Sequence, residues 1–144
     1  MLTVAASGAV ATEGVPGASR VEDTVRHFFQ DIEVYDFAAM RAAATPQFQI
    51  IDKGYRRDLA ELIALLRDER QAKDFKYQFR LSNFDTVVAP VVAYTTFVSH
   101  ERFSRPLAEG GEGDYINGVI LKRSGNRWLV DRVFHMTLKP EGGK

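Results

Sequence analysis

The chain has 144 residues, in which 19 basic side chains balance 19 acidic ones, and it contains no cysteine. This length fits one domain with a hydrophobic core of its own. The balanced charge, with no run of Lys or Arg, provides no long-range field to attract nucleic acid or an anionic membrane, and the missing cysteine excludes disulfides, thiolate metal sites and thiol nucleophiles.

The N-terminal stretch 1–18 differs from the rest of the chain because it is weakly apolar and rich in Gly and Ala. Ala9-Val10-Ala11 has the small-x-small form of a signal-peptidase site, but no basic residue precedes it. The stretch is either the end of a signal peptide, which would mean export, or a terminal arm with too little apolar mass to dock. We expect the arm and a cytoplasmic protein, with one domain over 19–140. No segment reaches the ~20 apolar residues of a membrane span.

Two helices are predicted at the start of the domain. Ser19 followed by Glu22 forms a capping-box pattern, and apolar residues behind it recur at helical spacing. This predicts a first helix over about 20–34. Asp36 is placed to cap a short second helix over 37–44.

A short apolar strand over 48–51 is predicted next, and it runs into the turn signal at 52–54. Asp58 and Glu61 then repeat the capping-box pattern. The amphipathic stripe behind them predicts a third helix that ends near residue 72.

After the third helix, the spacing of apolar residues changes from helical to alternating, which is typical of half-buried strands. The predicted strands are 75–81, 91–103, 115–123 and 127–138. A flexible connection is expected over 104–114 and a tight hairpin turn at 124–126. The order of elements predicts an α+β fold in which helices cover one face of a curved sheet. Since strand 91–103 is apolar on both faces, the second face is expected to pair with another subunit.

Four segments together resemble the nuclear transport factor 2-like, or SnoaL-like, superfamily over residues 21 to 138. They are VRHFFQDIEVYDFAAMRA, FQIIDKG, INGVILKRSGNRWLV and RVFHMTLK. Members include ketosteroid isomerase, scytalone dehydratase and SnoaL-like polyketide cyclases, and many have no known activity. The resemblance implies a cone-shaped, strongly curved antiparallel sheet with three N-terminal helices around one pocket, a cystatin-like roll that commonly forms homodimers.

Asp52 is the first candidate for catalysis, because the resemblance places it where ketosteroid isomerase keeps its catalytic aspartate. A carboxylate at the mouth of an apolar pocket can shuttle a proton next to a carbonyl group. The alternative is that Asp52 only accepts local amide bonds in a turn. Asn117 falls near the substrate-binding asparagine of scytalone dehydratase, and its alternative is a polar residue that faces water.

His100 is the third catalytic candidate, since it lies near a catalytic histidine of scytalone dehydratase. The match needs an offset of one residue, and such a slip reverses the face of a strand. Glu33 stands near that enzyme's first-helix aspartate, or is a solvated helix charge. The remaining candidates for substrate binding are Tyr77, Tyr115, Trp128 and His135, although core packing also explains Trp128.

The known catalytic sets are incomplete in this sequence. Phe28 stands where ketosteroid isomerase has a tyrosine, so the hydroxyl that would stabilise an enolate is missing. The histidines have no metal-binding spacing, and we expect neither a metal nor another cofactor. Two functions remain open. One is an isomerase, cyclase or dehydratase that acts on a small apolar carbonyl or hydroxy compound, with Asp52 as base and Asn117 and His100 orienting the oxygen. The other is a non-catalytic ligand-binding or dimerisation module.

Overall fold

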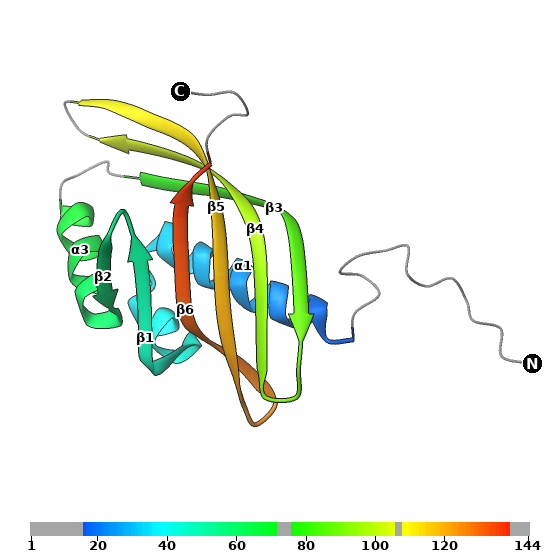
Figure 1. Ribbon diagram of the computed structural model, residues 1–144. Helices are drawn as coiled ribbons and strands as arrows, with labels where there is room; N and C mark the ends of the chain where they lie inside the picture. Colours follow the sequence, from blue (N-terminus) through cyan, green and yellow to red (C-terminus); the bar gives the residue numbers. More distant parts are fainter. Residues whose placement is uncertain (1–15, 72–75, 106–107, 139–144) are drawn as a thin grey trace, which may run out of the picture.

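The computed structural model describes residues 16–71, 76–105 and 108–138. Its elements are α1 (Ala18–Val34), α2 (Phe37–Ala43), β1 (Ala44–Asp52), β2 (Tyr55–Asp58), α3 (Leu59–Gln71), β3 (Lys76–Val88), β4 (Val92–Arg105), β5 (Ala108–Ser124) and β6 (Arg127–Thr137). The strands form one sheet in the order β2-β1-β6-β5-β4-β3. Figure 1 shows α1 crossing one face of this curved sheet, with α3 beside β1 and β2. None of the helices in the described ranges is long and apolar enough to cross a membrane.

The sheet is mixed, and the prediction of a fully antiparallel sheet is wrong in one pair. β1 runs parallel to β6, which places Ile50 opposite Val133 and Asp52 opposite His135. The other neighbouring strands are antiparallel. No hairpin joins β1 to β6, so no short turn fixes their relative direction. The parallel pair matters for function because it brings the end of β1 next to the end of β6.

The first predicted capping box is wrong. The N-cap of α1 is Gly17, with a left-handed φ of 80° and no side-chain cap bond, and Ser19 already lies inside the helix. Glu22 instead accepts a hydrogen bond from Thr86 of β3, at 2.8 Å. Ala18 is helical and buried. The rest of the expected arm, apart from residues 16 and 17, lies outside the described residues.

The other two predicted caps are confirmed. Asp36 Oδ1 accepts a hydrogen bond from the backbone N–H of Ala39 at 3.0 Å, at the start of α2. At the start of α3, Asp58 Oδ1 accepts from the Glu61 N–H at 2.8 Å, and the Asp58 N–H donates to Glu61 Oε1 at 3.4 Å. This reciprocal pair satisfies two backbone donors that the helix itself leaves open.

Replacing Asp58 with alanine is expected to lower the free energy of unfolding by about 1 kcal/mol, because the Glu61 N–H loses its acceptor. Urea denaturation measures this loss. The matched control is Asp68→Ala, which removes an exposed carboxylate from the same helix and should change stability by less than ~0.5 kcal/mol. Equal losses in the two variants would contradict the capping role.

Two further predictions differ from the structure in the β region. The flexible connection expected over 104–114 is largely strand, since Glu101 pairs with Gly113 and Arg102 with Glu112 between β4 and β5. Glycine-rich composition suggested a loop, but Gly111 lies under the Phe103 ring, where a Cβ would come within 2.1 Å of it. The four-residue β2 was not predicted, because its polar sequence YRRD carries no alternation. The tight turn between β5 and β6 is confirmed.

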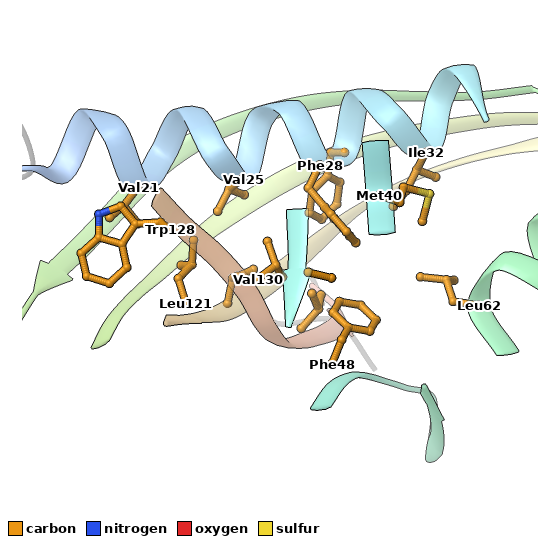
Figure 2. Close-up of a cluster of buried hydrophobic side chains, with 14 of the residues drawn as sticks. Val21, Val25, Phe28, Ile32, Met40, Phe48, Leu62, Leu121, Trp128 and Val130 are labelled. Atoms are coloured by element: carbon orange, nitrogen blue, oxygen red, sulfur yellow. The ribbon is translucent and has the colours of Figure 1, made fainter. Parts of the chain in front are cut away.

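The hydrophobic core lies between α1 and the inner face of the sheet. Every third or fourth residue of α1 is buried, which forms the apolar stripe of an amphipathic helix. Figure 2 shows this stripe facing Leu121, Trp128 and Val130 of the sheet, with Phe48 of β1 and Leu62 of α3 toward the other end of the core. Toward α3 this packing leaves room for a pocket.

Candidate functional site

An apolar pocket opens at the α3 end of the core, with walls from α1, α3 and the strands β1, β2, β3, β4 and β6. Its volume is about 110 Å³, which is room for on the order of ten water-sized groups. Most of the wall is aromatic and aliphatic, and the principal apolar residues are Phe28, Phe29, Ile32, Leu62, Leu66 and Phe79. The pocket therefore suits a small molecule with an apolar body.

Three ionisable side chains that could move a proton line this pocket, each from a different strand. Asp52 ends β1, Glu101 lies on β4, and His135 lies on β6. The parallel register sets Asp52 opposite His135, and His135 Nε2 lies 3.3 Å from Glu101 Oε2. Two carboxyl groups and an imidazole thus line one small apolar cavity.

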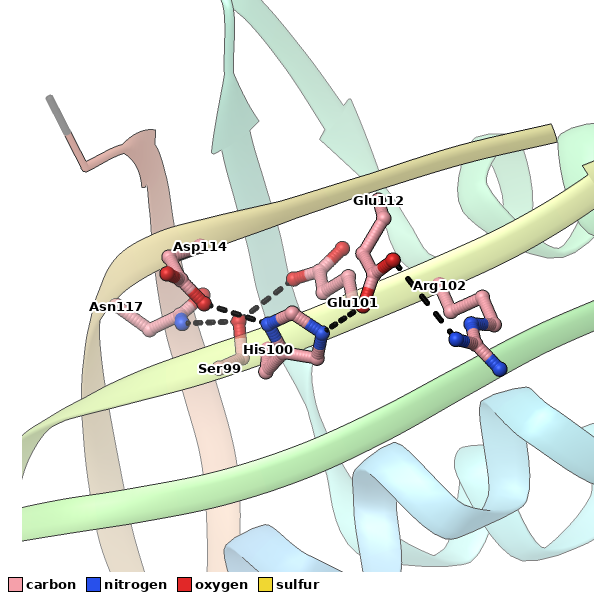
Figure 3. A network of polar contacts seen from close by, with 7 residues as sticks. All are labelled: Ser99, His100, Glu101, Arg102, Glu112, Asp114 and Asn117. Carbon is pink, nitrogen blue, oxygen red and sulfur yellow. Dashed lines mark hydrogen bonds and ion pairs between the residues drawn. The ribbon is translucent and has the colours of Figure 1, made fainter.

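A chain of three hydrogen bonds links Glu101 to His135. His135 Nδ1 lies 2.6 Å from Asn117 Oδ1, Asn117 Nδ2 donates to Ser99 Oγ at 2.9 Å, and Ser99 Oγ donates to Glu101 Oε2 at 2.6 Å. Figure 3 shows the part of this chain around Ser99. Because an amide oxygen can only accept, His135 carries a proton on Nδ1 and turns Nε2 toward Glu101. One further proton can reside between Glu101 and His135 Nε2.

Burial adjusts the proton affinity of this pair. The pKa of Glu101 is raised to about 7, mainly by desolvation and to a smaller extent by the charge of Asp52, while the hydrogen bond from Ser99 acts in the opposite direction. Desolvation lowers the pKa of His135, while the charge of Asp52 opposes this shift. Burial therefore favours the neutral form of both groups, and below pH 7 Glu101 is a carboxylic acid that can donate a proton.

Asp52 lies at the junction of a strand and a turn, and it faces the cavity. Lys53 and Gly54 have left-handed φ values of 48° and 80° and join β1 to β2, as expected for a two-residue hairpin. Within the described part of the chain, the Asp52 carboxylate accepts no hydrogen bond. Asp52 is thus the last residue of β1, directly before the turn. It does not accept the local amide bonds that the turn interpretation predicted, and its oxygens remain open to a ligand.

Several solved structures share this fold. A candidate ketosteroid isomerase from Shewanella frigidimarina is 18% identical, with a TM-score of 0.65 over 78% of this chain and 91% of that one. A candidate dehydratase of the NTF2-like family from Streptomyces avermitilis is 13% identical, with a TM-score of 0.71 over 83% and 95%. The association domain of C. elegans CaMKII is 12% identical, with a TM-score of 0.65 over 81% and 92%. The chain has the nuclear transport factor 2-like fold.

These identities show the fold alone. They confirm the α+β cone that the sequence predicted. No protein-family model matches the chain, and no curated protein matches it significantly. The function must therefore be inferred from the site.

His100 does not join the pocket of this NTF2-like fold. Its strand neighbours Ser99 and Glu101 are buried on the inner face, so the alternation of a strand turns His100 outward. There its Nδ1 lies 2.7 Å from Asp114 Oδ1 and its Nε2 contacts Glu112, as Figure 3 shows. These two hydrogen bonds raise the pKa of His100. The one-residue offset in the resemblance thus reverses the face, and Glu101 takes the inner position.

Glu33 and Trp128 also lie away from the pocket. Glu33 Oε1 accepts a hydrogen bond from the backbone N–H of Phe79 on the edge strand β3. Trp128 packs in the opposite end of the core, with the Arg123 guanidinium 5.6 Å from its ring. The position of Trp128 corresponds to the core packing that the sequence left open as its alternative. Glu33 is not the solvated helix charge of its alternative, because it is half-buried and bonded to the backbone of β3.

The two tyrosine candidates lie next to the polar groups. Tyr77 lines the pocket, and its hydroxyl donates to Glu69 Oε1 at 3.2 Å. Tyr115 stacks on His135, with ring centroids 4.3 Å apart. Asn117 is buried, and its Oδ1 accepts a hydrogen bond from His135 Nδ1.

Sequence reasoning missed Glu101 and Ser99. A signal existed in the alternation of β4, where the inner face reads Ala93, Thr95, Phe97, Ser99 and Glu101. A glutamate on a buried face is uncommon and indicates a partner or a function. The described residues contain no group of three or more His, Asp or Glu side chains arranged to hold a metal ion.

Proposed function

We propose that the pocket binds a small, largely apolar carbonyl or hydroxy compound and moves a proton on it. The observation that carries this proposal is the convergence of Asp52, Glu101 and His135 on one apolar cavity. The Asp52 carboxylate removes a proton from the carbon next to the carbonyl group. Protonated Glu101 donates a hydrogen bond to the carbonyl oxygen as negative charge develops there.

Two reactions are compatible with this arrangement, and they differ in where the proton on Glu101 and the proton taken by Asp52 finally go. In an isomerisation, Asp52 returns the proton to another carbon of the same molecule. In a dehydration, Glu101 gives its proton to the departing hydroxyl, which leaves as water, and Asp52 keeps the proton from carbon. Asn117 and Ser99 act as positioning residues that orient His135 and Glu101. Two structural neighbours are named as candidate enzymes of these classes, which supports this choice of chemistry.

Deuterium exchange tests the proposal without the natural substrate. Acetophenone and cyclohexanone are incubated with the protein in D₂O at pH 7, and the loss of the hydrogens next to the carbonyl is followed by ¹H NMR. We expect faster exchange than in buffer or with bovine serum albumin. Exchange at the buffer rate for both ketones would contradict the role of Asp52 as a base.

The outer face of the sheet favours a second function, the assembly of two copies of this chain. Val92, Tyr94, Ile120 and Phe134 line an apolar groove there, and Tyr94 and Met136 are 50% and 57% exposed. Monomers seldom leave an extended apolar patch uncovered. If the pocket has no activity, a homodimeric ligand-binding or dimerisation module is the remaining interpretation.

Tyr94→Glu is expected to convert a dimer into a monomer, because each copy would bury a charge in the interface. Sedimentation velocity at micromolar concentration measures the change. The matched control is Val34→Glu, since Val34 is 61% exposed on α1 and lies away from the outer face of the sheet. A wild-type protein that sediments as a monomer would contradict the assembly.

A further inference from the structure

The mouth of the pocket carries an arginine that no carboxylate neutralises. Arg57 pairs with Ile50 in the β1–β2 register, and its side chain lines the pocket together with Ile50 and Asp52. Its guanidinium carbon lies 4.9 Å from the centre of the Tyr55 ring. Over the described ranges of the chain, no ion pair joins Arg57 to an Asp or Glu. A guanidinium beside an apolar cavity thus has donors to offer to a ligand.

A second positive charge follows the lining residue Asp52 in the chain. Lys53 occupies the turn between β1 and β2, directly after Asp52. Its charge lowers the pKa of both Glu101 and His135, so its field reaches the interior of the pocket. A ligand in the pocket therefore lies beside Arg57 and within the field of Lys53.

The charges around the cavity do not cancel. Burial favours the neutral forms of Glu101 and His135, which leaves the Asp52 carboxylate against the cations Lys53 and Arg57. The polar side of the site thus carries a net positive charge, and the rest of its wall is apolar. The ligand that complements both features has an anionic end and an apolar body.

We propose that the pocket binds an organic acid, a keto or hydroxy acid with an apolar body, whose carboxylate pairs with Arg57. This inference rests on the proposed function and specifies the ligand of the same site. A planar guanidinium presents two parallel N–H donors that match the two oxygens of a carboxylate. With the carboxylate at Arg57, the apolar body lies against Phe28 and Leu62, and the carbonyl or hydroxyl group lies near Asp52 and Glu101.

A pair of probes with almost the same shape tests the assignment. 3-Phenylpropanoate and 3-phenylpropanamide differ mainly in charge, and their binding to the full chain is measured by titration of ¹H–¹⁵N NMR spectra. We expect the carboxylate to bind about tenfold more tightly than the amide, since its hydrogen bonds are assisted by charge. Arg57→Gln should remove most of this preference and leave the affinity for the amide unchanged.

Arg56→Gln is the matched control. Arg56 is the neighbouring residue, pairs with Ile51, is exposed and does not line the pocket. This variant should keep the tenfold preference, and thermal melts of both variants verify that they fold.

Three results would overturn the inference. Equal affinity of the wild type for both probes would reject an organic acid but leave the proposed proton transfer to the ketone exchange experiment. If the Arg56 and Arg57 variants lost the preference for the carboxylate to the same extent, the preference would be a general effect of positive charge, and the assignment to Arg57 would be rejected. Failure of the wild type to bind either probe, together with no exchange of either ketone, would reject both the inference and the proposed function.

Discussion

Asp52→Asn is expected to slow the exchange of hydrogens next to the ketone carbonyl by a factor of about 10² or more. Asparagine keeps the shape of the side chain, but its amide cannot accept the proton. The free energy of unfolding should change by less than ~0.5 kcal/mol, because within the described residues the Asp52 carboxylate accepts no hydrogen bond. ¹H NMR of acetophenone in D₂O gives the rate, and urea denaturation gives the stability.

His100→Gln is the control for this variant. His100 lies on the outer face, beside Glu112 and Asp114, so we expect the wild-type exchange rate. An Asp52→Asn variant that exchanges at the wild-type rate would remove Asp52 as the base. A comparable loss in His100→Gln would show that the outer face takes part in the reaction, contrary to the geometry.

Glu101→Gln is expected to change how stability depends on pH. The pKa of Glu101 is about 7 in the folded chain, against 4.5 for a free glutamate. The folded state therefore binds this proton more tightly, and the stability that it contributes is fully present below pH 4.5 and is lost as the pH rises through 7. The free energy of unfolding that is lost in this way is on the order of 3 kcal/mol. Glutamine does not ionise, still accepts from Ser99 and can donate to His135.

Urea denaturation at pH 4.5 and pH 9 tests this expectation. The stability of Glu101→Gln relative to wild type should increase by on the order of 3 kcal/mol between the two pH values. The nearby groups Asp52, Lys53 and His135 are present in both proteins, so the difference between them isolates Glu101. Glu112→Gln, on the outer face, should show no such increase. A relative stability that is the same at both pH values would place the titration of Glu101 in its ordinary range and remove it as an acid.

The helices were largely predictable because their signals are local. The amphipathic stripes predicted all three helices, and the capping residues Asp36 and Asp58 predicted where two of them begin. The start of α1 was not predictable in this way, since its N-cap is a glycine without a capping side chain. The parallel pairing of β1 with β6 was not predicted either, because these strands are far apart in the chain and no hairpin fixes their direction.

The site was predictable only where the sequence determined on which face of the sheet a residue lies. Asp52, Asn117 and His135 were named as candidates, and the structure brings them to one end of the inner face. For His100, a single slip in register decided between the two faces. Glu101 lacked a matching residue in the resemblance, and its role depends on burial and on its distance from His135, which no local pattern contains.

The most direct test of the central claim is a site-resolved NMR titration of the Glu101 carboxyl carbon in the wild-type protein. The account predicts a pKa near 7, and a shift of the Glu101 signal when acetophenone is added. In Asp52→Asn the pKa should fall, because the charge of Asp52 raises it. A Glu101 that titrates near 4.5 and does not respond to the ketone or to the loss of Asp52 would contradict a shared proton-transfer site.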